Sequence, residues 1–161
     1  MQTVDITIQT SEIDSDFSIS EWSEKTIEVV KNFLIKNKRL PPILLFLKFE
    51  NDKLFHCTAT FNFMSQSLDP VMHLLSEIIP SFLLEANAFI CVFAMVAESI
   101  IDGSEMLVIL TDGKDGSNNY YWEISKDEDK INLKSIKNDS LKIPTDKFPG
   151  FGIFQNETEL N

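Results

Sequence analysis

Hydrophobic and polar residues alternate along several segments of the chain, and this two-residue period is typical of β-strands with one buried face. The pattern begins at residues 4–9, which predict a short first strand. It returns at residues 54–63, where Phe, Cys and Ala occupy one face and His, Thr and Asn the other. Residues 43–49 come just before, and the polar turn at residues 50–53 predicts that these two segments form an antiparallel hairpin.

Two other segments have the period of an amphipathic helix. The first begins near residues 18–20. Its expected core-facing residues are Ile19, Trp22, Ile27, Val30, Phe33 and Leu34. Ile35 points outward with the charged residues, so it either folds under the chain where the helix ends or contacts a partner. The second helix is expected to begin at Asp69-Pro70 and to stop at Asn87, because Pro early in a helix and Asn after its end are typical boundaries.

Residues 88–97 are apolar on both faces, which predicts a strand in the centre of the sheet. Three further strands are predicted at residues 105–111, 120–125 and 130–136, with a polar loop at residues 112–119. Between residues 54 and 113 the chain has no Lys or Arg, which is typical of a segment that forms a protein interior.

These elements predict an α+β protein of order (β)αββαββββ, with an antiparallel sheet of about six strands and two helices packed on one face. The 161 residues suit a single domain, 1–161. Residues 1–16 and 155–161 are expected to be partly flexible, because chain ends are poorly ordered unless other elements hold them.

The net charge of −11 and the single arginine, Arg39, disfavour binding to a nucleic acid or an anionic membrane, because phosphate recognition uses clustered Lys and Arg. An acidic surface favours solubility or a basic protein partner. No apolar run reaches the roughly 20 residues that span a bilayer. The first residues also lack the basic and apolar regions of a secretory signal, so we expect a cytoplasmic protein.

Histidines and cysteines offer little chemistry. Cys57 and Cys91 lie at apolar-facing positions of predicted strands and are expected to be buried thiols, with a disulfide as the alternative if their strands are neighbours. His56 and Cys57 are consecutive in a strand, so they point to opposite faces and cannot share a metal ion. His73 faces solvent on the second helix, with Glu77 one turn further on. The histidines and cysteines therefore predict neither a metal site nor a cofactor.

Glu98 stands where the apolar strand 88–97 ends, and a desolvated carboxylate at such a place can serve as an acid or a base. Asp102, Glu105 and Asp112 could approach it across a hairpin, which would form a carboxylate cluster for a divalent cation. The alternative interpretation of Glu98 is a strand end that reaches water.

Aromatic residues are the remaining candidates for recognition: Trp22, Tyr120, Tyr121 and Trp122. Tyr120 and Trp122 share one face of their strand, and Tyr121 shares the other face with Glu123. Exposed aromatic side chains often mark contact surfaces. Both interpretations, core and interface, stay open for these residues.

The segments Pro41-Pro42-Ile43-Leu44, Ala88–Glu98 and Met106–Asp112 are the basis of a family resemblance. With the predicted helices, they form a succession that resembles small uncharacterised bacterial and phage-encoded α+β proteins. The resemblance covers about half of the chain. In that pattern the glutamate is followed by Ala-Trp, whereas Glu98 is followed by Ser99-Ile100. The resemblance implies no assigned activity and transfers no functional residue.

The sequence favours a non-enzymatic protein–protein interaction module, in the class that includes immunity proteins, inhibitors and secretion chaperones. Its partner would be another protein with a basic surface, or a second copy that pairs through an edge strand as a homodimer. The expected contact surfaces are the acidic N-terminal region and the wet face or the edge of the sheet. The alternative is a metal-dependent enzyme that uses the carboxylates near Glu98, Asp102 and Asp112.

Overall fold

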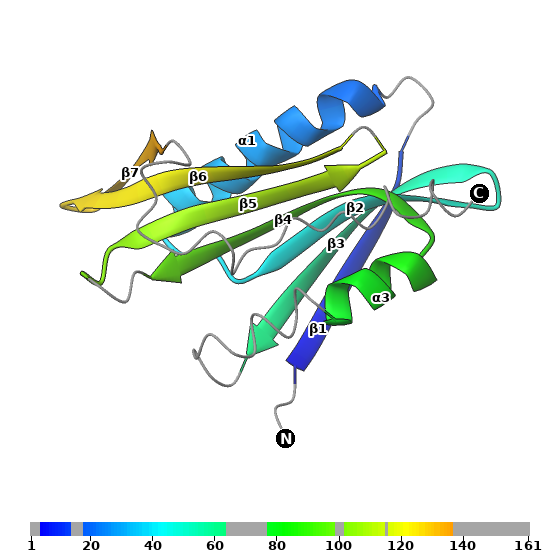
Figure 1. Ribbon diagram of the computed structural model, residues 1–161, viewed down its shortest axis with the longest axis horizontal. Coiled ribbons are helices and arrows are strands. Elements are labelled where there is room, and N and C mark those ends of the chain that lie inside the picture. Colours follow the sequence, from blue (N-terminus) through cyan, green and yellow to red (C-terminus); the bar gives the residue numbers. More distant parts are fainter. Residues whose placement is uncertain (1–3, 14–17, 64–76, 99–101, 115, 137–161) are drawn as a thin grey trace.

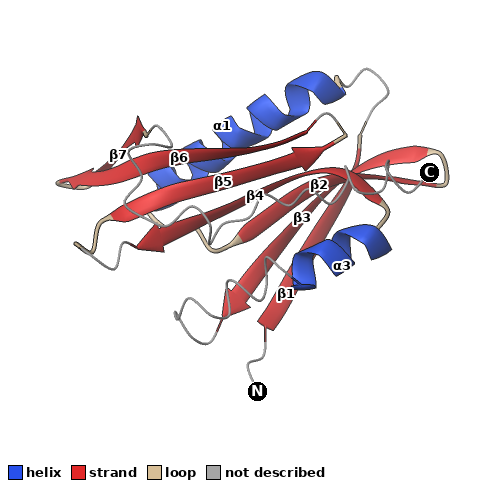
Figure 2. Ribbon diagram, in the orientation of Figure 1, coloured by secondary structure: helices blue, strands red, loops and turns tan. Residues whose placement is uncertain are grey.

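The computed structural model describes residues 4–13, 18–63, 77–98, 102–114 and 116–136. Within these residues the protein has one seven-stranded antiparallel sheet, in the order β1-β3-β2-β4-β5-β6-β7, and two helices (Figures 1 and 2). The elements are β1 (Val4–Glu12), α1 (Ile19–Asn37), β2 (Ile43–Glu50), β3 (Lys53–Phe63), α3 (Ile79–Glu85), β4 (Ala88–Glu98), β5 (Glu105–Gly113), β6 (Gly116–Asp127) and β7 (Lys130–Ser135). The predicted class and element order are confirmed. The sheet has seven strands rather than about six, because the N-terminal strand is a full member of it.

β4 lies in the middle of the sheet, as its apolar sequence predicts. It pairs with β2 on one side and with β5 on the other. Its residues 91–94 have no exposed surface, although they point alternately to the two faces. Both faces of the sheet are therefore covered at its centre.

The two helices cover opposite faces of the sheet, so the prediction that both pack on one face is wrong. Phe93 of β4 belongs to a buried cluster with Ile79 and Leu83 of α3, whereas the next residue back, Val92, belongs to a second cluster with Val30 of α1. Figure 2 shows α1 behind the strands and α3 in front of them. The physical reason is that a strand with two apolar faces needs a covering layer on each side. We call these sides the α1 face and the α3 face.

α1 buries a narrower stripe than its sequence pattern predicts. The buried residues are spaced four apart: Trp22, Thr26, Val30 and Leu34. Phe33 was expected in the core but is 45% exposed, because it lies at the border of this stripe; Ile35 points outward as predicted. The helix ends at Asn37, where Lys38 adopts a φ of 61° and its N–H donates a hydrogen bond to the Leu34 carbonyl (2.7 Å).

α3 is the described part of the second predicted helix. Pro80 lies in its first turn, where the missing N–H of proline leaves no hydrogen bond unmade. Asn87 follows the helix with a φ of 61° and donates its N–H to the Leu84 carbonyl (3.2 Å), which confirms the predicted stop. The predicted start at Asp69-Pro70 lies outside the described residues, as do His73, residues 14–16 and residues 155–161.

Tight turns join neighbouring strands of the sheet. The turn between β2 and β3 consists of Asn51 and Asp52, whose φ angles of 54° and 64° are those of a type I′ turn. β5 and β6 stay paired as far as Gly113 and Gly116, so the predicted polar loop at residues 112–119 is wrong. Gly116 has a φ of 135°, which favours glycine, and the polar residues at 112 and 117–119 occupy positions in the two strands.

Candidate interaction surfaces

β1 is an edge strand of the sheet, at one end of the strand order (Figure 1). Nine uninterrupted residue pairs join it to β3, and no other strand of the described residues pairs with it. Every side chain from Ile6 to Glu12 is exposed. The apolar ones are Ile6 (39% exposed) and Ile8 (49% exposed). Among the described residues, β1 therefore combines exposed apolar side chains with a strand edge that no other strand pairs.

One hydrogen bond identifies the amide groups of β1 that point outward. The N–H of Ile13, just beyond the strand, donates to the Leu54 carbonyl of β3 (2.9 Å). In an antiparallel pair, residues that bond to the neighbouring strand alternate with residues whose amide groups point the other way. The odd-numbered residues of β1 therefore bond to β3. The residues with outward N–H and C=O groups are Val4, Ile6, Ile8, Thr10 and Glu12.

The two edges of the sheet differ in their protection. β7 carries Lys130 and Lys134, and lysines on an edge strand disfavour pairing with another chain. β1 has no Lys, Arg or Pro, and no bulge interrupts its register with β3. Such an edge readily accepts an additional strand. Ile6 and Ile8 were not among the residues predicted for an interface, and the available signal for them is their alternation in a segment without lysine.

The candidate carboxylates do not come together in one cluster. Glu98, at the end of β4, pairs with Glu105 at the start of β5. Asp112 pairs with Cys91, at the opposite end of the same two strands. The stretch of β5 from residue 105 to residue 112 spans roughly 23 Å at the usual rise of a strand. One cation therefore cannot bind Glu98, Asp102 and Asp112 together.

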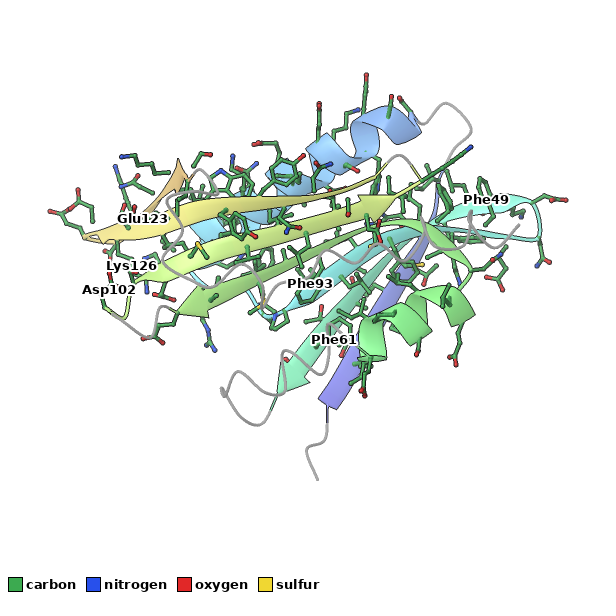
Figure 3. All side chains as sticks on the ribbon, in the orientation of Figure 1. Phe49, Phe61, Phe93, Asp102, Glu123 and Lys126 are labelled. Atoms are coloured by element: carbon green, nitrogen blue, oxygen red, sulfur yellow. The ribbon has the colours of Figure 1, made fainter. Side chains whose placement is uncertain are left out.

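At the turn between β4 and β5, the acidic side chains have local contacts. Glu98 is exposed, which agrees with the interpretation of a strand end that reaches water. The carboxylate of Asp102 accepts hydrogen bonds from the N–H (3.0 Å) and the hydroxyl (2.6 Å) of Ser104. Glu105 forms an ion pair with Lys126 (3.0 Å), and Figure 3 shows Asp102 and Lys126 at the same end of the sheet. The described part of the chain contains no group of three or more His, Cys, Asp or Glu residues that could hold a metal ion.

Cys91 and Asp112 are buried as cross-strand partners on the α3 face, with exposed fractions of 0% and 1%. Burial, followed by the neighbouring Asp112 carboxylate, raises the pKa of the Cys91 thiol well above its usual value, so this thiol is a poor nucleophile. Cys57 is also buried and free. Phe46 of β2 pairs with both cysteines and separates them by two strand spacings, about 10 Å, which is too far for a disulfide.

Two residues that the sequence proposed for an interface lie in the core instead. Trp22 is 3% exposed and packs in the cluster under α1. Tyr121 is also 3% exposed and packs in the cluster on the α3 face. For both aromatic residues the core interpretation is the correct one, because each lies on a covered face of its element.

Tyr120, Trp122 and Ile35 stay candidates for contact with a partner. The ring of Tyr120, 40% exposed, stacks on that of the half-buried Trp122 (centroid distance 6.1 Å). The ammonium group of Lys31 lies 5.1 Å from the centroid of the Trp122 ring, which places it in range of a cation–π contact. Ile35 follows Lys31 by four residues and therefore stands on the same flank of α1. These side chains form a second, smaller surface at the border between α1 and β6.

A hydrogen bond between Trp22 and His56 joins α1 to β3. The indole Nε1–H donates to Nδ1 of His56 (3.2 Å). Because an indole nitrogen can only donate, Nδ1 must be unprotonated, and the proton of the neutral ring is on Nε2, 3.4 Å from the Thr58 hydroxyl. Burial lowers the pKa of His56 below 6.5. The folded protein thus favours a neutral His56.

We expect this arrangement to make the protein less stable as the pH falls below about 6.5, the usual pKa of histidine. In that range the unfolded chain binds a proton at His56 more readily than the folded chain does. The stabilisation is therefore fully present above this pH and is lost as the pH falls from it through the lower pKa of His56 in the folded protein. Urea unfolding between about pH 7.5 and pH 5.5 measures the change.

The matched variant for this experiment is His56→Gln, which keeps a hydrogen-bond acceptor for Trp22 but does not titrate. We expect its urea midpoint to fall less than that of the wild type over the same range. Carboxylates titrate in both proteins and therefore cancel in the comparison. An equal fall in the two proteins would show that His56 is not the titrating group.

Comparisons with protein-family models, with curated proteins and with solved structures give no match for the chain. The resemblance to small bacterial and phage-encoded proteins therefore stays a prediction. Of the helices in the described residues, none combines the length and the apolar character needed to cross a membrane.

Proposed function

We propose that the protein is a non-enzymatic interaction module that binds other proteins, in the class of immunity proteins, inhibitors and secretion chaperones. The observation that carries this proposal is the edge of β1, which no other strand of the described residues pairs, where five residues direct their amide groups outward and the strand itself has no lysine or proline. A strand added to such an edge gains main-chain hydrogen bonds, and alternate side chains supply specificity. Ile6 and Ile8 are the apolar side chains available for that contact.

The charge of the chain supports a protein partner. A net charge of −11 with one arginine opposes contact with phosphate groups. Along α1 the exposed acids are Glu21, Glu24 and Glu28. Two of them form ion pairs with lysines of the same helix, Glu21 with Lys25 and Glu28 with Lys31, each at 3.3 Å. Exposed pairs of this kind add little stability, and with Lys36 the helix carries as many lysines as glutamates, so the acidic excess of the chain lies outside α1.

Selection from a display library of extended peptides tests this proposal. We expect the purified protein to select peptides that bind at β1, and the substitution Ile8→Pro to weaken their binding by at least about ten-fold, because it removes an outward N–H and places a ring on the edge. The N–H of Ile8 makes no hydrogen bond to β3, so the fold should tolerate a proline on this edge.

Ser135→Pro on β7 is the matched control. The N–H of Ile136 donates to the Tyr121 carbonyl, so the amide group of Ser135 points away from the sheet as that of Ile8 does. We expect this variant to bind the selected peptides like the wild type. Peptides that bind all three proteins equally, or a selection that yields no binder, would contradict the proposed role of β1.

A further inference from the structure

We infer that the strand added at β1 is β1 of a second copy, so that two chains form a two-fold dimer in which the two seven-stranded sheets join as one. This inference rests on the proposed function, since it names the occupant of the β1 edge. The second copy brings the same unprotected strand, whereas the other edge of the sheet, β7, carries lysines.

The hydrogen-bonding groups of β1 match those of an antiparallel copy. The outward groups belong to every second residue, so any two-fold register places outward residues opposite one another. With Ile8 on the axis, Ile6 faces Thr10 of the partner subunit and Val4 faces Glu12 of the partner subunit. All outward residues then have partners, and the junction gains about ten main-chain hydrogen bonds, two for each facing pair. This register uses the whole length of β1.

The side chains in this register are also compatible. Ile8 faces Ile8 of the partner subunit, with Ile6 of each chain on the diagonal, and β-branched neighbours of this kind stabilise sheets. The contact buries Ile6 and Ile8 of each chain, which are exposed in the single subunit. In the backbone register no two acidic positions oppose each other, because positions 5 and 12 stand opposite positions 11 and 4 of the second copy. A two-fold register centred on Thr7 would place Ile6 opposite Ile8 and also keep the acids apart, but it leaves Glu12 without a partner in β1, so the pairing of all five outward residues is what favours Ile8 on the axis.

Two properties limit the strength of the dimer. A single strand pair buries less than the roughly 800 Å² per partner of a standard interface, so dissociation in the micromolar range is expected. Each chain also carries a net charge of −11, so the two copies repel at low ionic strength. Added salt should therefore tighten the dimer, whereas it would weaken a complex with a basic partner.

Analytical ultracentrifugation of the full chain tests the inference at about 100 µM protein and about 0.3 M NaCl, where a micromolar dimer is populated and repulsion is screened. We expect the wild type to sediment at twice the chain mass of 18.4 kDa. Ile8→Lys should sediment as a monomer, because two lysines would meet at the axis. Its thermal midpoint as a monomer should stay close to that of the dissociated wild type, because Ile8 is exposed. Ser135→Lys on β7 is the control and should stay dimeric.

A pair of cysteine variants tests the register. Ile8→Cys places two thiols opposite each other, with Cα atoms about 5.5 Å apart, which is within disulfide range. Ile6→Cys makes the same change on the same edge, but its two copies lie four residues apart along the strands, about 13 Å. We expect mild oxidation to cross-link Ile8→Cys efficiently and Ile6→Cys hardly at all. The native cysteines are both buried and should not contribute.

Several results would overturn the inference. A monomeric wild type under these conditions excludes the second copy as the occupant, and the peptide selection then still decides whether β1 binds other proteins. A dimer that persists in Ile8→Lys places the interface elsewhere. Equal cross-linking of Ile6→Cys and Ile8→Cys excludes the two-fold register with Ile8 on the axis.

Discussion

We expect Phe93→Ala to lower the free energy of unfolding by about 3–5 kcal/mol, a large part of the 5–15 kcal/mol that stabilises a typical domain. Phe93 has no exposed surface and lies in the middle of the central strand β4 (Figure 3). Its ring belongs to the cluster that includes Phe46 of β2 and Leu83 of α3. These neighbours are held by paired strands and a helix, so they can close only part of the cavity that the substitution leaves. Chemical denaturation followed by circular dichroism measures the loss.

Phe33→Ala is the matched control for this prediction, because it removes the same side chain from α1, where 45% of it is exposed. We expect a change within about 0.5 kcal/mol, since surface substitutions have small effects and alanine favours helix more than phenylalanine does. Similar losses in the two variants would contradict the placement of Phe93 in the core.

Patterns within one element predicted the elements themselves well. The apolar run at residues 88–97 identified β4 and its central place, because only a strand covered on both sides can be apolar on both faces. Asn87 marked a helix end for an equally local reason, its tolerance of a positive φ. Such features depend on a few neighbouring residues, so the sequence carries them directly.

The arrangement of the layers could not be predicted in the same way. A pattern shows that Val92 and Phe93 are both buried, but it does not show which helix covers which face. Asp112 presents a similar case, because its polar neighbours favoured a loop. Pairing with β4, whose Cys91 is distant in sequence, places it in a strand and buries it instead. The faces that the helices cover and the burial of Asp112 both depend on contacts between residues distant in sequence.

The candidate sites divide along the same line. The chemistry expected of Glu98 and Asp112 needed the two ends of one hairpin to meet, and the register of β4 with β5 keeps them apart. The interaction surface on β1 could not be predicted without knowing which strand lies at the border of the sheet, and only the strand order shows this. Once that order is known, the absence of lysine and proline between residues 4 and 12 indicates an edge strand that is not protected against pairing.

Val92 points to the α1 face of β4, and we expect Val92→Asp to lower the free energy of unfolding by about 4 kcal/mol or more. Such a loss would leave the protein largely unfolded. Val92 has no exposed surface and packs with Val30 of α1 and Leu107 of β5. A carboxylate placed there loses its hydration among apolar side chains. Circular dichroism and thermal unfolding of the purified variant measure the effect.

Thr7→Asp provides the control, because Thr7 lies on the same face of the sheet but on the exposed strand β1. We expect this variant to unfold within about 0.5 kcal/mol of the wild type, as an exposed substitution should. Had both helices packed on the α3 face, Val92 would face water and the two aspartates would have similar, small effects. A large difference between the two variants therefore requires a layer over β4 on the α1 face, which is what places α1 and α3 on opposite sides of the sheet.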